Sequence, residues 1–543
     1  MKVYSGQSTL NAIRIIRVVC YLLLIAGITF SNAAQQSASV TPPQEQTSKQ
    51  AAKQLRESNA KLIRQAQKAI RSGKYEDALK IYLEMIDASP QDITGRLGAS
   101  FAYLKMQNYL RCFEQAAEAI NINKDNARAH ALSGISLLRS GFVRGAIAEL
   151  QQSINLDPRE ALAYGGAAEI DYYEGRPKDS RTKAYYAHQL DPEEPDYLVT
   201  YARSSSRVED FKEAADAYEL FLEISPQSDG ERRDRIRGLI QFYRQLAGLR
   251  VHQVSGPDVT QVPFQLGSDR RPYVRVKING RDAIFVIDTG SGFTVMSKEA
   301  AKKFGVSELA RGGKSQGVGG TGKFHIVYGL IKSIQVGDAR IRMVPCFIRP
   351  FHGSNEGPAE EKAAGFLGLS ILSHFVTELD YKESSMRLDR SDNSQKADTP
   401  GMKMIPFRTT QNGLISVETE FNNNKNLNAI VDSGASSTVV SMAAVDRLNM
   451  HDQIIKGQTA SVVGAAGITD NVQLLFIRDC RVADQLQSNL RALVLDFGAI
   501  NETSGFEQSG ILGGDFLRHF RLKIDFSRAL LALQPHTPSE TKQ

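Results

Sequence analysis

The sequence IFVIDTGS at residues 284–291 organises the C-terminal half of this 543-residue chain, because a second copy of it follows. The second copy, AIVDSGA at residues 429–435, contains Asp432 where the first contains Asp288. In each copy a run of apolar residues delivers one aspartate into a turn of small, hydroxylated residues. A single such turn often has only a structural role, with the aspartate capping its own backbone. The pair is therefore more informative than either copy alone.

The residues around the two aspartates repeat as well. VMS at residues 295–297 and VVS at residues 439–441 each lead into a segment expected to be helical. Further on, GFLG at residues 365–368 recurs as GILG at residues 510–513, and the dipeptide His-Phe follows both. Alternation of apolar and polar residues before each aspartate predicts short strands. Together these features indicate a duplicated all-β domain.

The paired motifs resemble those of the retropepsin-like aspartic proteases, over roughly residues 263–535. Both halves lie in one chain, as in pepsin, although each half is of the short retroviral kind. The resemblance implies that Asp288 and Asp432 form a catalytic dyad that needs no metal and no other cofactor. It also implies that hydroxyl groups cross-link the two turns and that glycines let backbone amides approach the carboxylates. These supporting residues are Thr289, Gly290, Ser433 and Gly434.

Such a dyad needs two carboxylates that share one water. One carboxylate must be ionised to take a proton from the water, and the other must be protonated to polarise the scissile carbonyl. Like charges about 3 Å apart cannot both ionise, so the pair titrates with one low and one raised apparent pKa. Because water attacks the peptide, no covalent intermediate is expected.

Two glycine-rich segments are predicted to form flaps over the cleft. GVGGTG at residues 317–322 contains Gly319 and Gly320, and VGAAG at residues 463–467 contains Gly464. Glycine gives a lid the mobility to close over an extended substrate. A phosphate-binding loop is the competing interpretation of the first segment, and it fails because no Lys-Ser/Thr follows. Neither flap has the tyrosine of pepsin-like enzymes, which keeps a non-catalytic binding role open.

The chain is 42% apolar and 23% charged, like ordinary globular proteins. Its net charge is +6 without a Lys/Arg-rich run, so no nucleic-acid partner is expected. Residues 1–33 are predicted to be a signal peptide, since basic residues precede the apolar run 18–30 and small residues follow it. This favours a periplasmic or secreted protein with a flexible linker at residues 34–56. An uncleaved membrane anchor is the alternative, although the apolar run is shorter than the roughly 20 residues that a span needs.

Cysteine and histidine are sparse. Cys112, Cys346 and Cys480 follow the predicted signal peptide, and an odd number without close pairs predicts neither a disulfide framework nor a zinc motif. We expect all three to be small buried apolar residues. His374 and His519 occupy equivalent places in the two halves, and we expect them to be structural.

The segment 57–250 repeats with a period of about 34 residues. A small residue stands five positions after each register point, and proline ends four of the five repeats. This resembles five tetratricopeptide repeats followed by a capping helix at residues 232–250. Stacking buries the apolar face of each helix pair, and such a superhelix leaves a concave groove expected to bind a peptide or protein partner. The register points are Gly73, Gln107, Gly141, Gly175 and Glu209.

The predicted architecture is an all-α tetratricopeptide superhelix followed by a bilobal all-β aspartic-protease-like domain. The leading hypothesis is an exported aspartic endopeptidase of bacterial type that acts on polypeptides, with the array recruiting substrate or partner. The alternatives are a non-catalytic peptide-binding scaffold in the cell envelope and a factor whose activity lies in the repeats. The expected protease boundaries are a linker at 251–270, half 1 at 271–390, a linker at 391–402, half 2 at 403–535 and a tail at 536–543.

Overall fold

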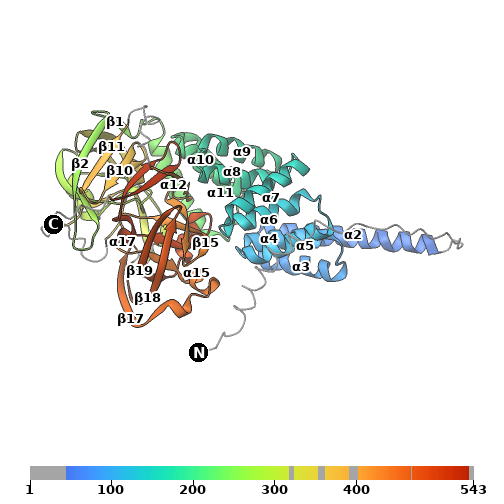
Figure 1. The fold of residues 1–543 in the computed structure, drawn as a ribbon. Helices are drawn as coiled ribbons and strands as arrows, with labels where there is room; N and C mark the ends of the chain where they lie inside the picture. Colours follow the sequence, from blue (N-terminus) through green and yellow to red (C-terminus); the bar gives the residue numbers. More distant parts are fainter. Residues whose placement is uncertain (1–43, 317–322, 352–360, 391–401, 466, 537–543) are drawn as a thin grey trace.

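A computed structural model describes residues 44–316, 323–351, 361–390, 402–465 and 467–536. Within these ranges a helical array precedes a region of β-strands (Figure 1). The predicted signal peptide and residues 391–401 of the predicted linker lie outside the described residues. No helix in the described part of the chain is long and apolar enough to cross a membrane.

The helical array consists of helix pairs. The second helix of each pair begins 34 residues after the second helix of the preceding pair, which is the period of the sequence repeat. The small residue of each repeat is fully buried between the two helices of its pair, at Ala78, Cys112, Ala146, Ser180 and Ala214. The helices are α2 (Gln44–Arg71), α3 (Tyr75–Ala88), α4 (Ile93–Lys105), α5 (Tyr109–Ile122), α6 (Ala127–Arg139), α7 (Val143–Leu156), α8 (Ala161–Tyr173), α9 (Pro177–Leu190), α10 (Asp196–Arg207), α11 (Phe211–Ile224) and α12 (Gly230–Leu246).

Two boundaries of the array differ from the prediction. Helix α2 begins at Gln44, inside the segment 34–56 that the sequence predicts to be a flexible linker. Its Gln, Lys, Glu and Ala residues are good helix formers, so a composition that is typical of a linker also suits a helix. The capping helix α12 ends at Leu246 and not at Arg250, because Gly248 adopts a positive φ of 82° that ends helices.

The first half of the β-region surrounds the first aspartate. It contains β1 (Gln253–Ser255), β2 (Val259–Leu266), β3 (Pro272–Ile278), β4 (Arg281–Ile287), β5 (Thr294–Met296), α13 (Lys298–Phe304), β6 (Ser307–Gln316), β7 (Lys323–Val336), β8 (Ala339–Ile348), β9 (Gly365–Leu367), α14 (Leu369–Leu372), β10 (Val376–Asp380) and β11 (Ser385–Asp389).

The second half repeats this order of elements and adds helix α16 before β20. It contains β12 (Met404–Pro406), β13 (Arg408–Thr409), β14 (Ile415–Phe421), β15 (Asn424–Val431), β16 (Val439–Ser441), α15 (Met442–Arg447), β17 (Ile454–Gly464), β18 (Gly467–Val482), β19 (Gln485–Leu495), α16 (Gly498–Ser504), β20 (Gly510–Leu512), α17 (Gly514–Leu517), β21 (Phe520–Asp525) and β22 (Leu530–Pro535).

A shared sheet joins the two halves. Strands β12, β22 and β21 of the second half continue into β10, β11 and β2 of the first, and β21 pairs antiparallel with β10. The segment 251–270 is therefore not the linker that the sequence predicts, because it contains β1 and β2. In β2, Thr260, Val262 and Phe264 are buried at alternate positions, and its glycine-rich flanks hid this short strand in the sequence.

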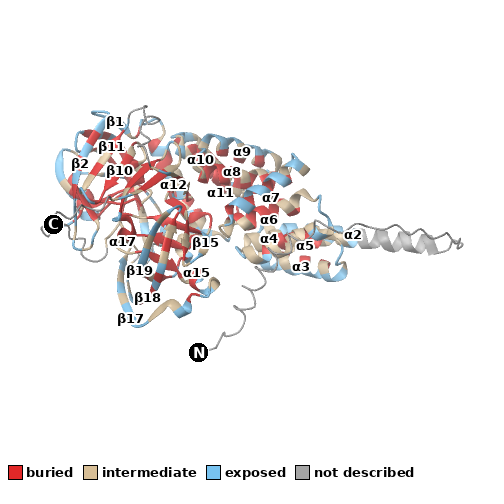
Figure 2. Cartoon of the chain, in the orientation of Figure 1, coloured by how far each residue is buried: buried red, intermediate tan, exposed pale blue. Residues whose placement is uncertain are grey.

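Buried residues occur throughout the array and the β-region (Figure 2), and two hydrophobic clusters contain residues of both regions. Tyr328 of β7 stacks on Phe242 of α12 with ring centroids 4.4 Å apart. Phe506, which follows α16, packs on Tyr173 of α8 at 5.1 Å. Both tyrosines and both phenylalanines are buried. The array is thus packed against the protease region and not merely tethered to it.

Candidate active site

The two aspartates emerge from equivalent strands. β4 ends just before Asp288 and pairs in parallel with β9, and β15 ends just before Asp432 and pairs in parallel with β20. Strands β9 and β20 contain the apolar residues of the two apolar-apolar-glycine elements. Each aspartate N–H donates to a leucine carbonyl of the paired element, Leu367 at 3.1 Å and Leu512 at 3.0 Å. The repeated motifs therefore form one unit in each half.

The residues after the aspartates cross-link the two turns. The N–H of Thr289 donates to Ser433 Oγ at 3.1 Å, and the N–H of Ser433 donates to Thr289 Oγ1 at 2.9 Å. Thr289 Oγ1 donates to the Val431 carbonyl at 2.8 Å, and Ser433 Oγ donates to the Ile287 carbonyl at 2.8 Å. Thr289 is fully buried and Ser433 is 1% exposed. These four bonds hold the halves together within a single chain.

The glycines let the two turns approach closely. A Cβ atom at Gly290 would lie 2.2 Å from Asp432 Cγ, and one at Gly434 would lie 2.5 Å from Asp288 Oδ1. Any side chain at either position would therefore displace the opposite carboxylate. The structure thus brings together all six residues that the sequence predicts for the dyad and its support.

Each carboxylate accepts hydrogen bonds from its own turn. Gly290 N–H and Ser291 Oγ donate to Asp288 at 2.9 and 2.7 Å, and Gly434 N–H donates to Asp432 Oδ1 at 2.8 Å. Burial and the nearby charge of Asp288 hold the pKa of Asp432 well above its usual range, and the backbone hydrogen bonds oppose this shift. The pair therefore favours the singly protonated state that water activation requires.

The flap predictions have different outcomes. Gly319 and Gly320 fall in residues 317–322, outside the described part of the chain. The strands β6 and β7 that flank them form an antiparallel hairpin. Gly464 lies at the end of β17 and pairs with Gly467 at the start of β18, so the second predicted flap is the tip of a hairpin.

Helix α12 supports the first hairpin. A Cβ atom at Gly238 of α12 would lie 2.1 Å from the Cα atom of Gly312 in β6, so backbone meets backbone there. Lys323 at the start of β7 forms an ion pair of 2.7 Å with Glu231. The contact between Gly238 and Gly312 was not predicted from the sequence, because no local pattern around either glycine indicates its distant partner.

Sequence analysis also missed Arg349, which follows β8. Burial lowers the pKa of its guanidinium, and the charge of Asp288 opposes that shift. The guanidinium lies 5.6 to 5.7 Å from the ring centroids of three phenylalanines, and its Nη1 donates to the Ala465 carbonyl at 3.4 Å. A half-buried cation thus connects the first half to the tip of the second hairpin. The three rings are Phe324, Phe351 and Phe366.

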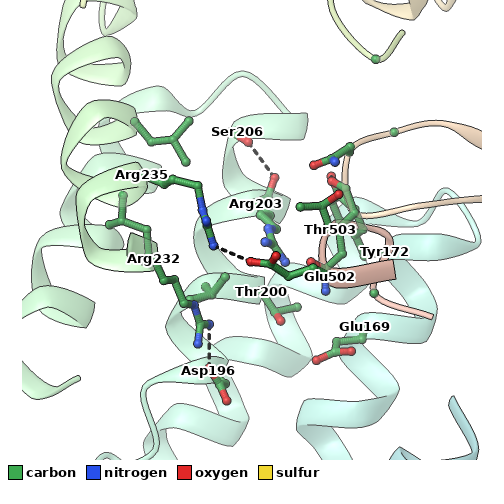
Figure 3. Close-up of a pocket in the computed structure, with 18 of the residues that line it drawn as sticks. Glu169, Tyr172, Asp196, Thr200, Arg203, Ser206, Arg232, Arg235, Glu502 and Thr503 are labelled. Carbon is green, nitrogen blue, oxygen red and sulfur yellow. Dashed lines mark hydrogen bonds and ion pairs between the residues drawn. The ribbon is translucent and has the colours of Figure 1, made fainter. Parts of the chain in front are cut away.

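A cavity of about 1530 Å³ lies between the array and the protease region and is lined by residues of both. Residues 290–293 of the first aspartate turn, Arg349 and Ala465 line one part of it, and groove-facing residues of the array line another. In Figure 3, Arg203 and Thr200 of α10 lie across from Glu502 of α16, and Arg235 of α12 forms an ion pair with Glu502 at 3.1 Å. The repeat groove therefore opens towards the active-site turn.

The array groove already holds part of the second half. Arg139 donates to the Gly505 carbonyl at 2.7 Å, and Tyr172 donates to the Gln411 carbonyl at 3.2 Å. Asn428 donates to the Gly141 carbonyl at 3.1 Å. The sequence predicts a groove for a peptide or protein, and part of it binds the protease region of the same chain.

Cys112, Cys346 and Cys480 are buried, as expected, and have no disulfide partner among the described residues. Burial raises the pKa of the Cys112, Cys346 and Cys480 thiols to about 12. They are therefore protonated at neutral pH and are poor nucleophiles.

Family comparisons agree with the duplicated site. Residues 274–371 match the family described as "Aspartyl protease", and residues 417–519 match the family described as "gag-polyprotein putative aspartyl protease". The chain thus has two tandem aspartyl-protease domains after a tetratricopeptide-like array, and these domains support aspartic peptidase activity. No curated protein matches the chain.

Solved structures resemble separate parts of the chain. An aspartic proteinase from Irpex lacteus is 14% identical with a TM-score of 0.33, covering 52% of this chain and 99% of its own. Basic 7S globulin from soybean is 10% identical with a TM-score of 0.32, covering 52% and 95%. A tetratricopeptide protein of Thermus thermophilus is 16% identical with a TM-score of 0.28, covering 35% and 99%.

Proposed function

We propose that the protein is an exported aspartic endopeptidase in which Asp288 and Asp432 activate water to hydrolyse polypeptides. The observation that carries this proposal is the cross-linked pair of aspartate turns, in which each glycine lies against the opposite carboxylate. Retention of both aspartates and both hydroxyl residues supports activity over a purely structural role. Export rests on the N-terminal sequence alone.

In the proposed mechanism the dyad shares one proton. Asp432 holds it, consistent with the raised pKa of its carboxyl group. Asp288, supported by hydrogen bonds from Gly290 and Ser291, is the base that takes a proton from the attacking water. Asp432 then donates its proton to the scissile carbonyl oxygen as the tetrahedral intermediate forms. As this intermediate collapses, Asp288 gives the proton it took from water to the leaving amine, the C–N bond breaks, and the hydroxyl formed from the carbonyl returns a proton to Asp432.

The array has two roles in this proposal. Its groove holds the second half in place through Arg139, Tyr172 and Gly141. The remaining cavity is continuous with residues 290–293, so an unfolded segment bound there would lead towards the dyad. Substrate recruitment and positioning of the protease region would then use the same helices.

Identification of the cleavage products tests this proposal. The purified full chain is incubated with a denatured protein mixture at pH 3 to 8, with and without a pepstatin-type inhibitor, and new termini are identified by mass spectrometry. Endopeptidase activity predicts internal cuts that the inhibitor prevents. Release of terminal residues only, or internal cuts that the inhibitor leaves unchanged, contradicts it. Peptide binding without cleavage at every pH supports the scaffold alternative.

A further inference from the structure

Three residues from distant parts of the chain meet at the junction of the array and the first protease half. Glu209 lies in the turn between α10 and α11, His252 follows α12, and His374 follows α14. One ring nitrogen of each histidine and one carboxylate oxygen of Glu209 all lie within 4.8 Å of one another. This group is separate from the aspartate dyad, and the proposed hydrolysis does not use it.

The geometry of the group suits a tetrahedral metal ion. His252 Nδ1 lies 3.1 Å from Glu209 Oε1, and the two histidine rings are 4.6 Å apart. Two ligand atoms bound to zinc at about 2.0 Å in a tetrahedral site are about 3.3 Å apart. Side-chain movements of about 1 Å would therefore bring all three donors into range. All three residues line the large cavity, which leaves a fourth position for water.

One further observation concerns the surroundings of His252. Its Nε2, the ring nitrogen that does not contact Glu209, is buried and has no hydrogen-bond partner among the described residues, although buried polar atoms normally have one.

The types of donor atom also suit a metal. Two imidazole nitrogens with one carboxylate form a donor set that zinc and similar divalent transition ions prefer, unlike magnesium or calcium.

We propose that Glu209, His252 and His374 bind one divalent zinc-type ion that links the array to the first protease half. The three ligands come from the array, from the segment that leaves it and from the end of the first apolar-apolar-glycine unit. An ion bound there would therefore hold the orientation of the array over the active-site cavity. The ion would have a structural role, because its ligands are not those of the dyad.

The equivalent residue in the second half provides a matched control. His519 takes the place of His374 in the duplication, and no comparable group forms around it among the described residues. His252→Ala, His374→Ala and Glu209→Gln each remove or neutralise one proposed ligand. His519→Ala removes a histidine from the corresponding turn and should leave metal binding intact.

Zinc titration of the full chain after chelator treatment tests the proposal by calorimetry. We expect one zinc per wild-type and His519→Ala chain, and binding weaker by about 100-fold or more in His252→Ala and His374→Ala. Zinc at one hundred times Kd should raise the thermal unfolding midpoint of the wild type by about 2–3 °C. Cobalt binding, followed by its visible absorption, should show the same pattern.

Two results would overturn this proposal. One is the absence of zinc binding to the wild type at about 100 μM total zinc, taken as the weakest affinity useful for a structural ion. The other is equal affinity in wild type, His252→Ala and His374→Ala. If a histidine variant fails to fold, Glu209→Gln decides the matter, because this glutamate is exposed and its substitution spares the core. Unchanged affinity in that variant would contradict the proposed ligand set.

Discussion

The two protease halves have equivalent aspartate turns, but their hairpins have different surroundings. The first hairpin, β6 and β7, is backed by α12, and its Tyr328 is buried in a core that includes array helices. The second hairpin consists of β17 and β18 (Figure 1), and near its tip Val463 is 52% exposed and Ile468 is 55% exposed. Duplication thus preserved the chemical centre while one hairpin became an attachment surface and the other stayed open.

This difference assigns different tasks to the two flaps. The backbone of the first hairpin at Gly312 lies directly against the backbone of α12 at Gly238. This hairpin therefore has little freedom to move unless the array moves with it. The second hairpin has exposed apolar side chains at its tip, which an incoming polypeptide can cover. We therefore expect substrate closure to come mainly from the second hairpin. The following predictions test where the halves are equivalent and where they differ.

The largest effect is expected at the two dyad glycines, where the halves are equivalent. Gly290→Ala and Gly434→Ala would each place a Cβ atom within 2.5 Å of the opposite carboxylate. Misplacing a catalytic group by about 1 Å costs about 100-fold in rate, so each variant should lose at least that much of kcat/KM. Gly498→Ala is the control, since its new Cβ would make only an ordinary contact at 3.5 Å. A large loss in only one of the two dyad variants would contradict the symmetry.

Removing the cross-linking hydroxyl of the first half or that of the second half should destabilise the protein to a similar extent. Thr289→Val and Ser433→Ala each remove a donor to a main-chain carbonyl and leave a buried N–H without its acceptor. Each should lower the free energy of unfolding by about 2–3 kcal/mol. Chemical denaturation measures this, and Thr289→Ser, which retains the hydroxyl, is the control. A loss smaller than about 0.5 kcal/mol, the lower end of the range for one hydrogen bond, would contradict the proposed role.

The contact between α12 and the first hairpin should be sensitive to added volume. Gly238→Val forces side-chain atoms into the backbone of Gly312 and should cost about 1–3 kcal/mol of stability. It should also lower kcat/KM, because the displaced hairpin borders the cleft. Gly230→Ala in the same helix meets nothing within 4 Å and is the matched control. Unchanged activity and stability in Gly238→Val would show that the hairpin does not depend on α12.

Arg349 provides a test of charge that is confined to the first half. The strand registers make the buried Leu495 its equivalent in the second half, and the neighbouring Asp496 is exposed. Arg349 is a half-buried cation for which no ion pair is found among the described residues. We expect Arg349→Met to raise KM about 10-fold for peptides with an acidic residue near the cleavage site, by analogy with charge-assisted hydrogen bonds. Asp496→Asn should change KM little. Equal effects on acidic peptides and their amide counterparts would contradict a charge-based role.

The pH dependence of stability should reveal the proton held by the dyad. Because the pKa of Asp432 is raised on folding, the folded chain binds this proton more tightly than the unfolded chain. The free energy of unfolding should therefore fall as pH rises from about 4, the ordinary aspartate pKa, through the raised value. The Asp432→Asn variant does not lose stability in this way. The difference between its melting temperature and that of the wild type should therefore shift in favour of the variant as pH rises. Asp496→Asn is the exposed control, and parallel profiles for all three proteins would contradict the prediction.

The sequence was sufficient to predict those features whose motifs repeat along the chain. Asp288 and Asp432 could be predicted because a duplicated motif surrounds each of them, and the array because its small residues recur at a fixed period. Arg349, the Gly238–Gly312 contact and the Glu209–His252–His374 group could not, because each depends on residues brought together only by the packing of the array on the protease region. Single residues without a repeat or a local pattern carry no such signal.

Cleavage by the two dyad variants tests the central claim most directly. Wild type, Asp288→Asn and Asp432→Asn are purified in parallel and incubated with the same denatured protein mixture from pH 3 to 8, after thermal unfolding has verified that each is folded. We predict internal cleavage by the wild type and its loss in both single variants at every pH. Cleavage that survives in either variant would contradict a dyad shared by the two halves.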